Sequence, residues 1–203
     1  IILKDYELIS EWVAKYIHLK ITNSDHIVIG LPTGSTPIGV YKNLIKFKTS
    51  FKNVITFNMD EYIGLSPKHE QSYNYFMDNN LFSHIDIDRD NINIPNGIAI
   101  DTEKECIEYE NKIKKLGGID LFLCGIGSDG HIAFNEPGSS FNSVTRVKTL
   151  TSETISDNSR FFNNIDEVPK TAITVGIKTV MDAKEIIIMA NGINKANAVK
   201  QLI

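Results

Sequence analysis

The amino-acid sequence predicts an α/β protein with a doubly wound, mainly parallel sheet and helices on both faces. Apolar runs of strand length alternate with helical patterns along the chain. Most of these runs are nearly continuous Ile, Val and Leu, as strands covered on both faces require. A length of 203 residues with 42% hydrophobic content suits one core, so we expect residues 1–203 to form a single α/β domain.

The expected elements follow from the spacing of apolar residues. Residues 5–17 suit an amphipathic helix, because Leu8, Trp12 and Tyr16 recur at i, i+4 spacing. The expected strands are 26–31, 53–59, 91–95, 119–127, 171–177 and 185–192, and the further helices lie within 32–47, 73–81, 102–115 and 156–162. In this modified Rossmann-like arrangement, ligands are expected beyond the carboxyl ends of the strands.

Composition and charge disfavour several classes of protein. The formal net charge of −4 disfavours nucleic acid and anionic membranes as partners and favours a small molecule. No apolar run approaches the roughly 20 residues that span a bilayer. The two cysteines, Cys106 and Cys124, show neither CxxC spacing nor a disulfide pattern, so we expect free thiols and a cytoplasmic protein. The sequence stops inside the helical pattern of residues 194–203, so we expect further C-terminal sequence.

The first loop after a strand, "GLPTGSTP" at residues 30–37, suits a phosphate group. Gly34 frees the backbone, Ser35 or Thr36 can cap the next helix, and Pro37 suits its first turn. Free N–H groups and the positive end of that helix would then face the ligand. The loop lacks the GK[ST] of a nucleotide P-loop, so a monophosphate is favoured over ATP. An ordinary capped helix start is the alternative.

The second loop, "TFNMDEYIGL", places Asp60 and Glu61 after a strand of apolar and neutral side chains. A carboxylate at that depth is costly unless it is solvated, paired or used. Partial burial would raise its pKa toward that of a useful base. We expect one of the two acids to face the crevice, although the sequence does not say which. The alternative is that Asp60 caps the following loop.

The third loop, "GIGSDGHIAFNEP" at residues 125–137, contains a literal GxGxxG. A dinucleotide is rejected, because Asp129 would oppose the pyrophosphate charge and Pro137 prevents a long helix from following. Asp129, His131 and Glu136 could instead ligate a metal ion. An acid/base role accounts for more of the stretch, since this set could relay a proton to a sugar ring oxygen. A structural hydrogen bond between the histidine and a carboxylate is the plainest alternative.

Two cations near the ends of predicted elements are further candidates. Arg160 lies in "NSRFF" and Lys195 in "NGINKANAV". Taken alone, each of these cationic side chains is typical of a residue exposed to solvent. Together with the GSTP loop they would clamp a phosphate, the arginine through a bidentate fork and the lysine as a point charge.

In combination, these motifs resemble those of a known family, the glucosamine-6-phosphate deaminases, also called glucosamine-6-phosphate isomerases. The matching stretches lie in order over essentially the whole chain: "LPTGSTP", "TFNMDEY", "SYNYFM", "GGIDLFLCGIGSDGHIAFNEPGSS", "TRVKTLT", "NSRFF" and "VPKTAITVGIKTVMDA". The resemblance implies conversion of glucosamine 6-phosphate and water to fructose 6-phosphate and ammonia, in amino-sugar and N-acetylglucosamine catabolism. It also implies no redox cofactor and no catalytic metal.

Carried over residue by residue, the resemblance assigns roles to the candidates. Asp60 matches the base that moves a proton between C2 and C1, and His131 matches the ring-opening catalyst, supported by Asp129 and Glu136. The residues that match substrate-binding positions are Gly34, Ser35, Thr36, Arg160 and Lys195 at the phosphate, and Tyr62 and Tyr73 along the site or its approach. In similar enzymes, the segment of residues 150–170 moves as a lid over the sugar.

The resemblance also bears on assembly and regulation. Some relatives are hexamers activated by N-acetylglucosamine 6-phosphate at an intersubunit site, so we expect a homo-oligomer. Ser139, Arg146 and Lys148 match that region, whereas Val144 stands where basic residues are common. Allosteric activation is therefore left open.

Three other functions compete with a deaminase. A lactonase acting on 6-phosphogluconolactone would share the fold and a phosphate loop, but ester hydrolysis needs no second base over C2. A catalytically silent sugar-phosphate sensor would not require Asp60 and His131. A metal-dependent hydrolase is the minor alternative, which insensitivity to a chelator would eliminate.

Overall fold

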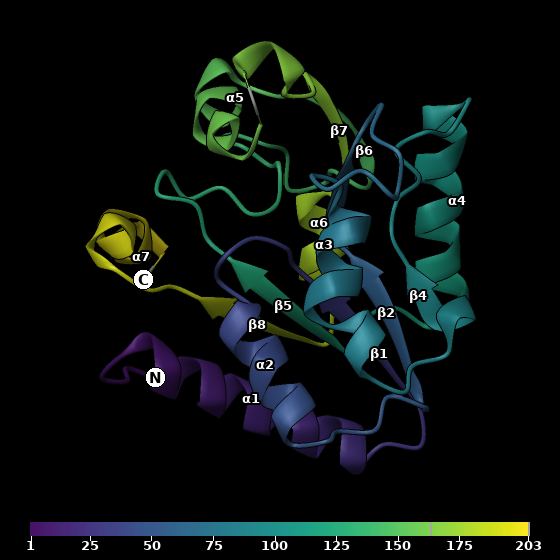
Figure 1. Cartoon of the computed structure of the whole chain (residues 1–203), viewed down its shortest axis with the longest axis vertical. Helices are drawn as coiled ribbons and strands as arrows, with labels where there is room; N and C mark the ends of the chain where they lie inside the picture. Colours follow the sequence, from purple (N-terminus) through teal and green to yellow (C-terminus); the bar gives the residue numbers. More distant parts are fainter. Residues whose placement is uncertain (163, 203) are drawn as a thin grey trace.

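The computed structural model describes residues 1–162 and 164–202, and its centre is a five-stranded sheet (Figure 1). The strand order is β4-β2-β1-β5-β8, and every neighbouring pair is parallel. The strands are β1 Ile27–Leu31, β2 Val54–Asn58, β4 Ile92–Asn93, β5 Leu121–Gly125 and β8 Glu185–Met189. The parallel sheet predicted from the apolar runs is confirmed.

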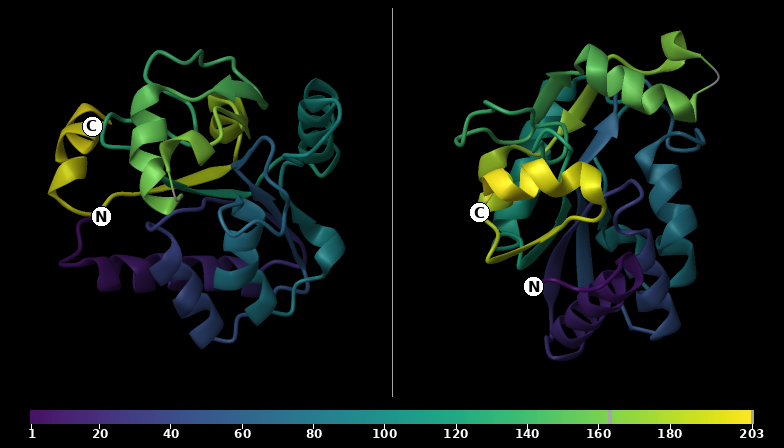
Figure 2. Two further views of the ribbon diagram at one scale, coloured as in Figure 1. Left: turned by 45° about the horizontal axis from the view of Figure 1, so that its top comes forward. Right: turned by 90° about the vertical axis from the view of Figure 1, so that its left-hand side faces the viewer.

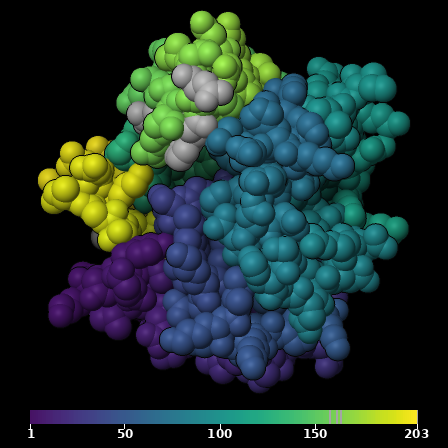
Figure 3. Space-filling model, in the orientation of Figure 1, coloured from purple at the N-terminus to yellow at the C-terminus, as the bar shows by residue number. Residues whose placement is uncertain are grey.

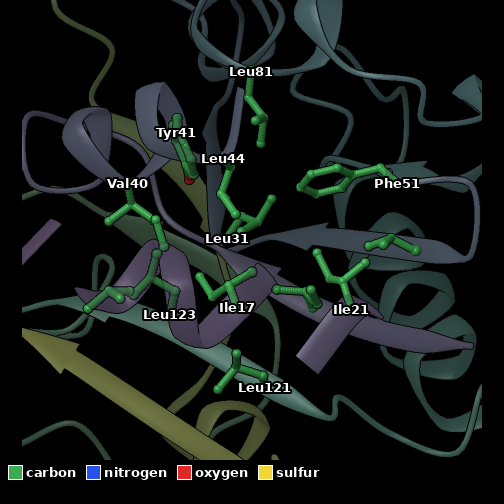
Figure 4. Close-up of a cluster of buried hydrophobic side chains, with 14 of the residues drawn as sticks. Ile17, Ile21, Leu31, Val40, Tyr41, Leu44, Phe51, Leu81, Leu121 and Leu123 are labelled. Carbon is green, nitrogen blue, oxygen red and sulfur yellow. The ribbon is translucent and has the colours of Figure 1, made fainter. Parts of the chain in front are cut away.

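Helices cover both faces of this sheet, as predicted (Figure 2). One face carries α1 Tyr6–Thr22, α2 Ile38–Lys46 and α3 Tyr73–Asn80, and the other carries α4 Thr102–Lys115 and α6 Ile177–Met181. Strand β1 shows why two cores form, because successive side chains of a strand point to opposite faces. Its Ile29 and Leu31 lie in the core with α1 and α2, where Figure 4 shows Leu31, whereas Val28 lies in the core with α4.

The boundaries of α1 and α4 follow from capping and burial. Asp5 and Asp101 are the N-caps, each accepting a hydrogen bond from a backbone N–H three residues on. Helix α4 occupies the predicted range, whereas α1 continues to Thr22. The sequence predicted that Leu8 and Trp12 lie on the buried face of α1. Their side chains are 44% and 37% exposed, so they lie at the edge of that face.

A second, antiparallel sheet stands beside the parallel one, in the order β3-β7-β6. Its strands are β3 Asp60–Tyr62, β6 Arg146–Thr149 and β7 Thr171–Thr174. The sequence predicted the strand at β7 but neither β3 nor β6. Strand β3 is only three residues long, and β6 alternates half-buried and exposed residues, so neither forms an apolar run. The mainly parallel fold is therefore correct but incomplete.

The remaining elements are short and lie mostly toward the C-terminus. They are α5 Ser152–Asn158 and α7 Ala196–Leu202, with 3-10 turns at Phe82–His84, Arg89–Asn91, Ser159–Phe161, Ile165–Glu167 and Ile193–Lys195. The helix predicted over 156–162 is thus α5 followed by a 3-10 turn. Among the described residues, no helix has both the length and the apolar character that crossing a bilayer demands.

Gly30 tests how tightly the parallel sheet packs against α4. A Cβ added at Gly30 would lie 2.3 Å from the ring of Phe122 on β5. We therefore expect Gly30→Ala to lower the free energy of unfolding by about 1–3 kcal/mol in urea denaturation, through overpacking. Gly125→Ala is the control, because its added Cβ would meet only Thr36 at 3.5 Å. Equal stability of the two variants would contradict this account.

Candidate active site

A pocket of about 440 Å³ lies where the loops after β1, β2 and β5 meet, beyond the carboxyl ends of these parallel strands. This is the place that the fold class predicts for a ligand. The predicted site residues that line the pocket are Gly34, Ser35, Thr36, Asp60, Tyr62, Tyr73, His131, Arg160 and Lys195. Asp129 and Glu136 do not line it. On the face shown in Figure 3, a hollow separates the α5 segment in light green from the C-terminal segment in yellow.

The loop after β1 presents polar groups to one end of the pocket. Gly34 has a φ of +82°, a conformation that favours glycine. The expected cap by Ser35 or Thr36 is wrong: Pro37 is the N-cap of α2, and the structure shows no side-chain capping hydrogen bond there. Because neither hydroxyl is occupied in capping, both are available to a ligand.

Two cationic side chains reach the same pocket from distant parts of the chain. Arg160 lies in the 3-10 turn after α5, and Lys195 lies in the turn before α7. Together with the N-terminus of α2, they bring positive charge to the lining of the pocket. The structure thus brings together the loop and the two cations that the sequence marked as a phosphate clamp.

Asp60 brings a buried carboxyl group to the pocket. It begins β3, directly after the chain has left β2, and is 6% exposed. Among the described residues, none donates a hydrogen bond to its carboxylate. Burial, with a further contribution from the charge of Glu61, raises the pKa of Asp60 to about 8. A carboxylate this basic is a suitable general base near neutral pH.

Glu61 points to the other side of β3 and serves a different purpose. Its Oε1 accepts hydrogen bonds from the backbone N–H groups of Tyr62 and Tyr73, and its Oε2 accepts one from Asn74, each at 2.9 Å. These contacts place the carboxylate on the N-terminus of α3. Burial raises the pKa of Glu61, and the three N–H donors oppose that rise. Of the two acids, Asp60 therefore faces the pocket.

The loop after β5 holds His131 against Asp129. The Nδ1 of His131 lies 2.6 Å from Oδ1 of Asp129. Gly127 makes room for this pair, since an added Cβ there would lie 2.4 Å from the His131 ring. Partial burial raises the pKa of Asp129, but the charge and hydrogen bonds of His131 lower it by more. His131 lines the pocket. Because its Nδ1 is paired with Asp129, its Nε2 is the nitrogen available for proton transfer.

Glu136 connects the same loop to the segment above it. Its Oε1 accepts hydrogen bonds from the hydroxyls of Thr154 at 3.0 Å and Thr151 at 3.3 Å, at the start of α5. One ligand atom each from Asp129, His131 and Glu136 lies within 4.8 Å of the others, so the three could also hold a metal ion. Both possibilities that the sequence left open are therefore compatible with the geometry.

Aromatic side chains form a wall that the sequence only half revealed. Tyr62 and Tyr73 were expected along the site, and their ring centroids are 4.9 Å apart. Phe134 packs on both, at 5.7 Å and 6.2 Å, and Phe162 meets Tyr62 edge-on at 6.2 Å. No spacing signal in the sequence connects the two phenylalanines, because they come from separate loops.

Comparison with known proteins identifies the family. Residues 6–203 match the family model of glucosamine-6-phosphate isomerases and 6-phosphogluconolactonases. The chain belongs to this family. It is 58% identical to a glucosamine-6-phosphate deaminase of Parabacteroides distasonis, covering 100% of this chain and 79% of that protein. It is 59% identical to a glucosamine-6-phosphate deaminase of Fusobacterium nucleatum, covering 93% of this chain and 73% of that protein.

Solved structures of the family agree with this assignment. A monomeric glucosamine-6-phosphate deaminase superposes with a TM-score of 0.96 at 44% identity, covering 98% of this chain and 85% of that one. A 6-phosphogluconolactonase from Thermotoga maritima reaches 0.76 at 20% identity, covering 98% and 87%. The second likeness shows the shared fold alone.

The buried Asp60 leads to a prediction about stability. Its pKa is about 8 in the folded protein against 3.8 for an unperturbed aspartate, so between these pH values the folded state binds a proton that the unfolded state has released. The free energy of unfolding should therefore fall as pH rises from about 4 to 8. We expect Asp60→Asn to be more stable than the parent at pH 7, on the order of 1–4 kcal/mol, with a smaller difference at pH 4.

Asp129→Asn is the matched control for this urea-denaturation series. The folded-state pKa of Asp129 is lowered, so its ionised form contributes stability above its unfolded pKa, and that stability is lost as pH falls through the folded pKa. We therefore expect Asp129→Asn to lose stability at pH 7. A stability difference for Asp60→Asn that does not change with pH would contradict the raised pKa of Asp60.

Proposed function

We propose that the protein is a glucosamine-6-phosphate deaminase, which converts glucosamine 6-phosphate and water to fructose 6-phosphate and ammonia. The observation that carries this proposal is a single pocket lined by two cationic side chains, by the histidine of a His–Asp pair and by a separate buried carboxyl group. The names of the relatives at 58% and 59% identity support the substrate.

The cationic side chains of the pocket would hold the phosphate and orient the sugar. Arg160 and Lys195 supply charge, and the loop of residues 33–36 supplies backbone and hydroxyl groups. A phosphate fixed at one end leaves the ring directed toward Asp60 and His131. Binding energy from this non-reacting group would thereby position the reacting carbons.

His131 would open the sugar ring. Its Nε2 would take the proton of the anomeric hydroxyl and deliver it to the ring oxygen as the bond between C1 and that oxygen breaks, and Asp129 would hold the imidazole through Nδ1. Ring opening produces the aldehyde that makes the C2 proton acidic. Glu136 would support this step from the loop that it connects to α5.

Asp60 would then carry the proton between carbons. Its carboxylate would remove the C2 proton of the open aldose and return it to C1, while a proton passes from the C2 ammonium group to the C1 oxygen, which leaves a hydroxymethyl group at C1 and an iminium group at C2. Water adds to that carbon, ammonia departs, and fructose 6-phosphate remains. Because Asp60 is buried and receives no hydrogen bond from the described residues, its ionised carboxylate is more basic than an exposed one, which suits removal of a weakly acidic C–H proton.

The cover of the pocket suits a mobile lid. Residues of the expected lid segment, 150–170, that line the pocket are Thr154, Asn158, Arg160 and Phe162. Closure would exclude water from the isomerisation step. Its movement stays a prediction.

Assembly, regulation and location also stay predictions. Arg146 and Lys148 lie two residues apart on β6 and are half-buried, as is Ser139, so these three side chains are accessible to a ligand such as N-acetylglucosamine 6-phosphate. The related structure at 44% identity is that of a monomeric deaminase, which gives no support to a homo-oligomer. The cytoplasmic location rests on the cysteines alone.

The first test measures both products. We expect glucosamine 6-phosphate to yield equal amounts of ammonia and fructose 6-phosphate, with and without a chelator. Asp60→Asn should lose about 10²- to 10⁴-fold in kcat and still bind the substrate. Binding without turnover by the parent protein would favour the sensor. Hydrolysis of 6-phosphogluconolactone without ammonia release would favour the lactonase, and loss of activity with chelator would favour a metal-dependent enzyme.

Arg160 provides a separate prediction about the phosphate end. We expect Arg160→Ala to raise KM for glucosamine 6-phosphate by about tenfold or more, with a smaller change in kcat, because a charge-assisted contact to the phosphate is lost. Arg89→Ala is the matched control, since Arg89 is exposed and pairs with Asp78 outside the pocket. An unchanged KM in Arg160→Ala would remove this residue from the phosphate site.

A further inference from the structure

We infer that Tyr6 is a positioning residue for the phosphate end of the pocket, acting through its hydroxyl group on the loop after β1. Tyr6 is the first residue of α1 and does not line the pocket. It lies about thirty positions before the loop in the sequence, and no motif connects the two. The phosphate itself rests on the proposed function, whereas the contacts of Tyr6 are features of the structure.

The hydroxyl of Tyr6 engages three backbone groups at once. It lies 3.0 Å from the carbonyl oxygens of both Ser35 and Thr36, which share its single proton. It also accepts a hydrogen bond from the backbone N–H of Gly39 at 2.8 Å. Gly39 lies in the first turn of α2, where N–H groups have no partner within the helix. One side-chain oxygen therefore joins the loop to the helix that follows it.

These contacts set the direction in which the loop presents its polar groups. In a trans peptide, C=O and N–H point in opposite directions. Because the Ser35 carbonyl points to Tyr6, the N–H of Thr36 points away from Tyr6. Among the described residues, none accepts a hydrogen bond from the N–H groups of Gly34, Ser35 or Thr36. Tyr6 thus keeps two carbonyl dipoles off a bound anion and leaves donors for it.

The packing of α1 on α2 brings Tyr6 close enough for this role. A Cβ added at Gly39 would lie 2.4 Å from the hydroxyl of Ser10 and 3.1 Å from the Tyr6 ring. Only glycine at this position permits the approach of the two helices as it stands. At the start of the same loop, Tyr41 of α2 donates to the carbonyl of Pro32 at 2.5 Å. Tyrosine hydroxyls from α1 and α2 therefore hold successive carbonyls of the loop.

The test removes a single oxygen atom from Tyr6 in the whole chain. We expect Tyr6→Phe to weaken binding of inorganic phosphate about tenfold in calorimetry, and to raise KM for glucosamine 6-phosphate by a similar factor, with kcat within about twofold. Tyr16→Phe is the matched control, because this second tyrosine of α1 donates to Glu185 on β8 and lies outside the pocket. The thermal midpoint of both variants is recorded beside the binding constants.

The outcomes separate positioning from plain stability. Weaker phosphate binding in Tyr6→Phe but not in Tyr16→Phe supports the inference, as does the same defect in Gly39→Ala, which would force α1 away from α2. A loss of thermal stability with unchanged phosphate affinity would overturn it. Phosphate binding needs no turnover, so absence of ammonia release by the parent protein would refute the proposed function and leave this test decisive.

Discussion

A backbone hydrogen bond joins the two sheets, and both acid/base positions of the pocket depend on it. The N–H of Val175 donates to the carbonyl of Met59 at 2.8 Å, where the chain passes from β2 of the parallel sheet to β3 of the antiparallel one. Asp60 follows at once and is paired with Thr174 on β7. The His131 loop is attached to the last residue of β7 and to the residue that follows it: the Phe134 N–H donates to the Thr174 hydroxyl, and the side chain of Asn135 donates to the Val175 carbonyl. A shift of β7 would therefore move the two positions together and preserve their separation.

The different surroundings of the Asp60 and Glu61 carboxylates show how one short strand contributes both to folding and to chemistry. Glu61 accepts hydrogen bonds from three backbone N–H groups, two of them at the N-terminus of α3 and one on β3 itself, so its burial is offset and the helix is anchored. Asp60, one residue earlier, receives no such donor from the described residues and carries a pKa of about 8. The alternation of a strand is what directs the two carboxylates to opposite sides. Burial of the Asp60 carboxyl group therefore lowers the stability of the folded protein, which is typical of a functional site.

How far a strand or side chain is buried determines whether the sequence predicts it. Four of the five parallel strands were predictable because strands covered on both faces appear in the sequence as apolar runs, whereas β4, Ile92–Asn93, lies in a short extended stretch of alternating Asn and Ile. Strands β3 and β6 were not, because a three-residue strand and a half-exposed edge strand leave no such pattern. The motif loops indicated most of the pocket residues, yet the choice between Asp60 and Glu61 required the register of β3 with β7. Contacts between remote segments, such as those of Phe134 and Phe162 with Tyr62 or of Tyr6 with the phosphate loop, have no local signal in the sequence.

The function within this family has to be argued from the site, because deaminases and lactonases share the fold. Hydrolysis of a lactone needs one base to activate water, and the His131–Asp129 pair would suffice. A second carboxyl group, buried and without donors from the described residues, is a cost that such a reaction does not explain. Movement of a proton between two adjacent carbons does explain it, since the group must be basic when ionised and must retain the proton until it is delivered. The raised pKa of Asp60 is therefore the feature of the pocket that separates isomerisation with deamination from ester hydrolysis.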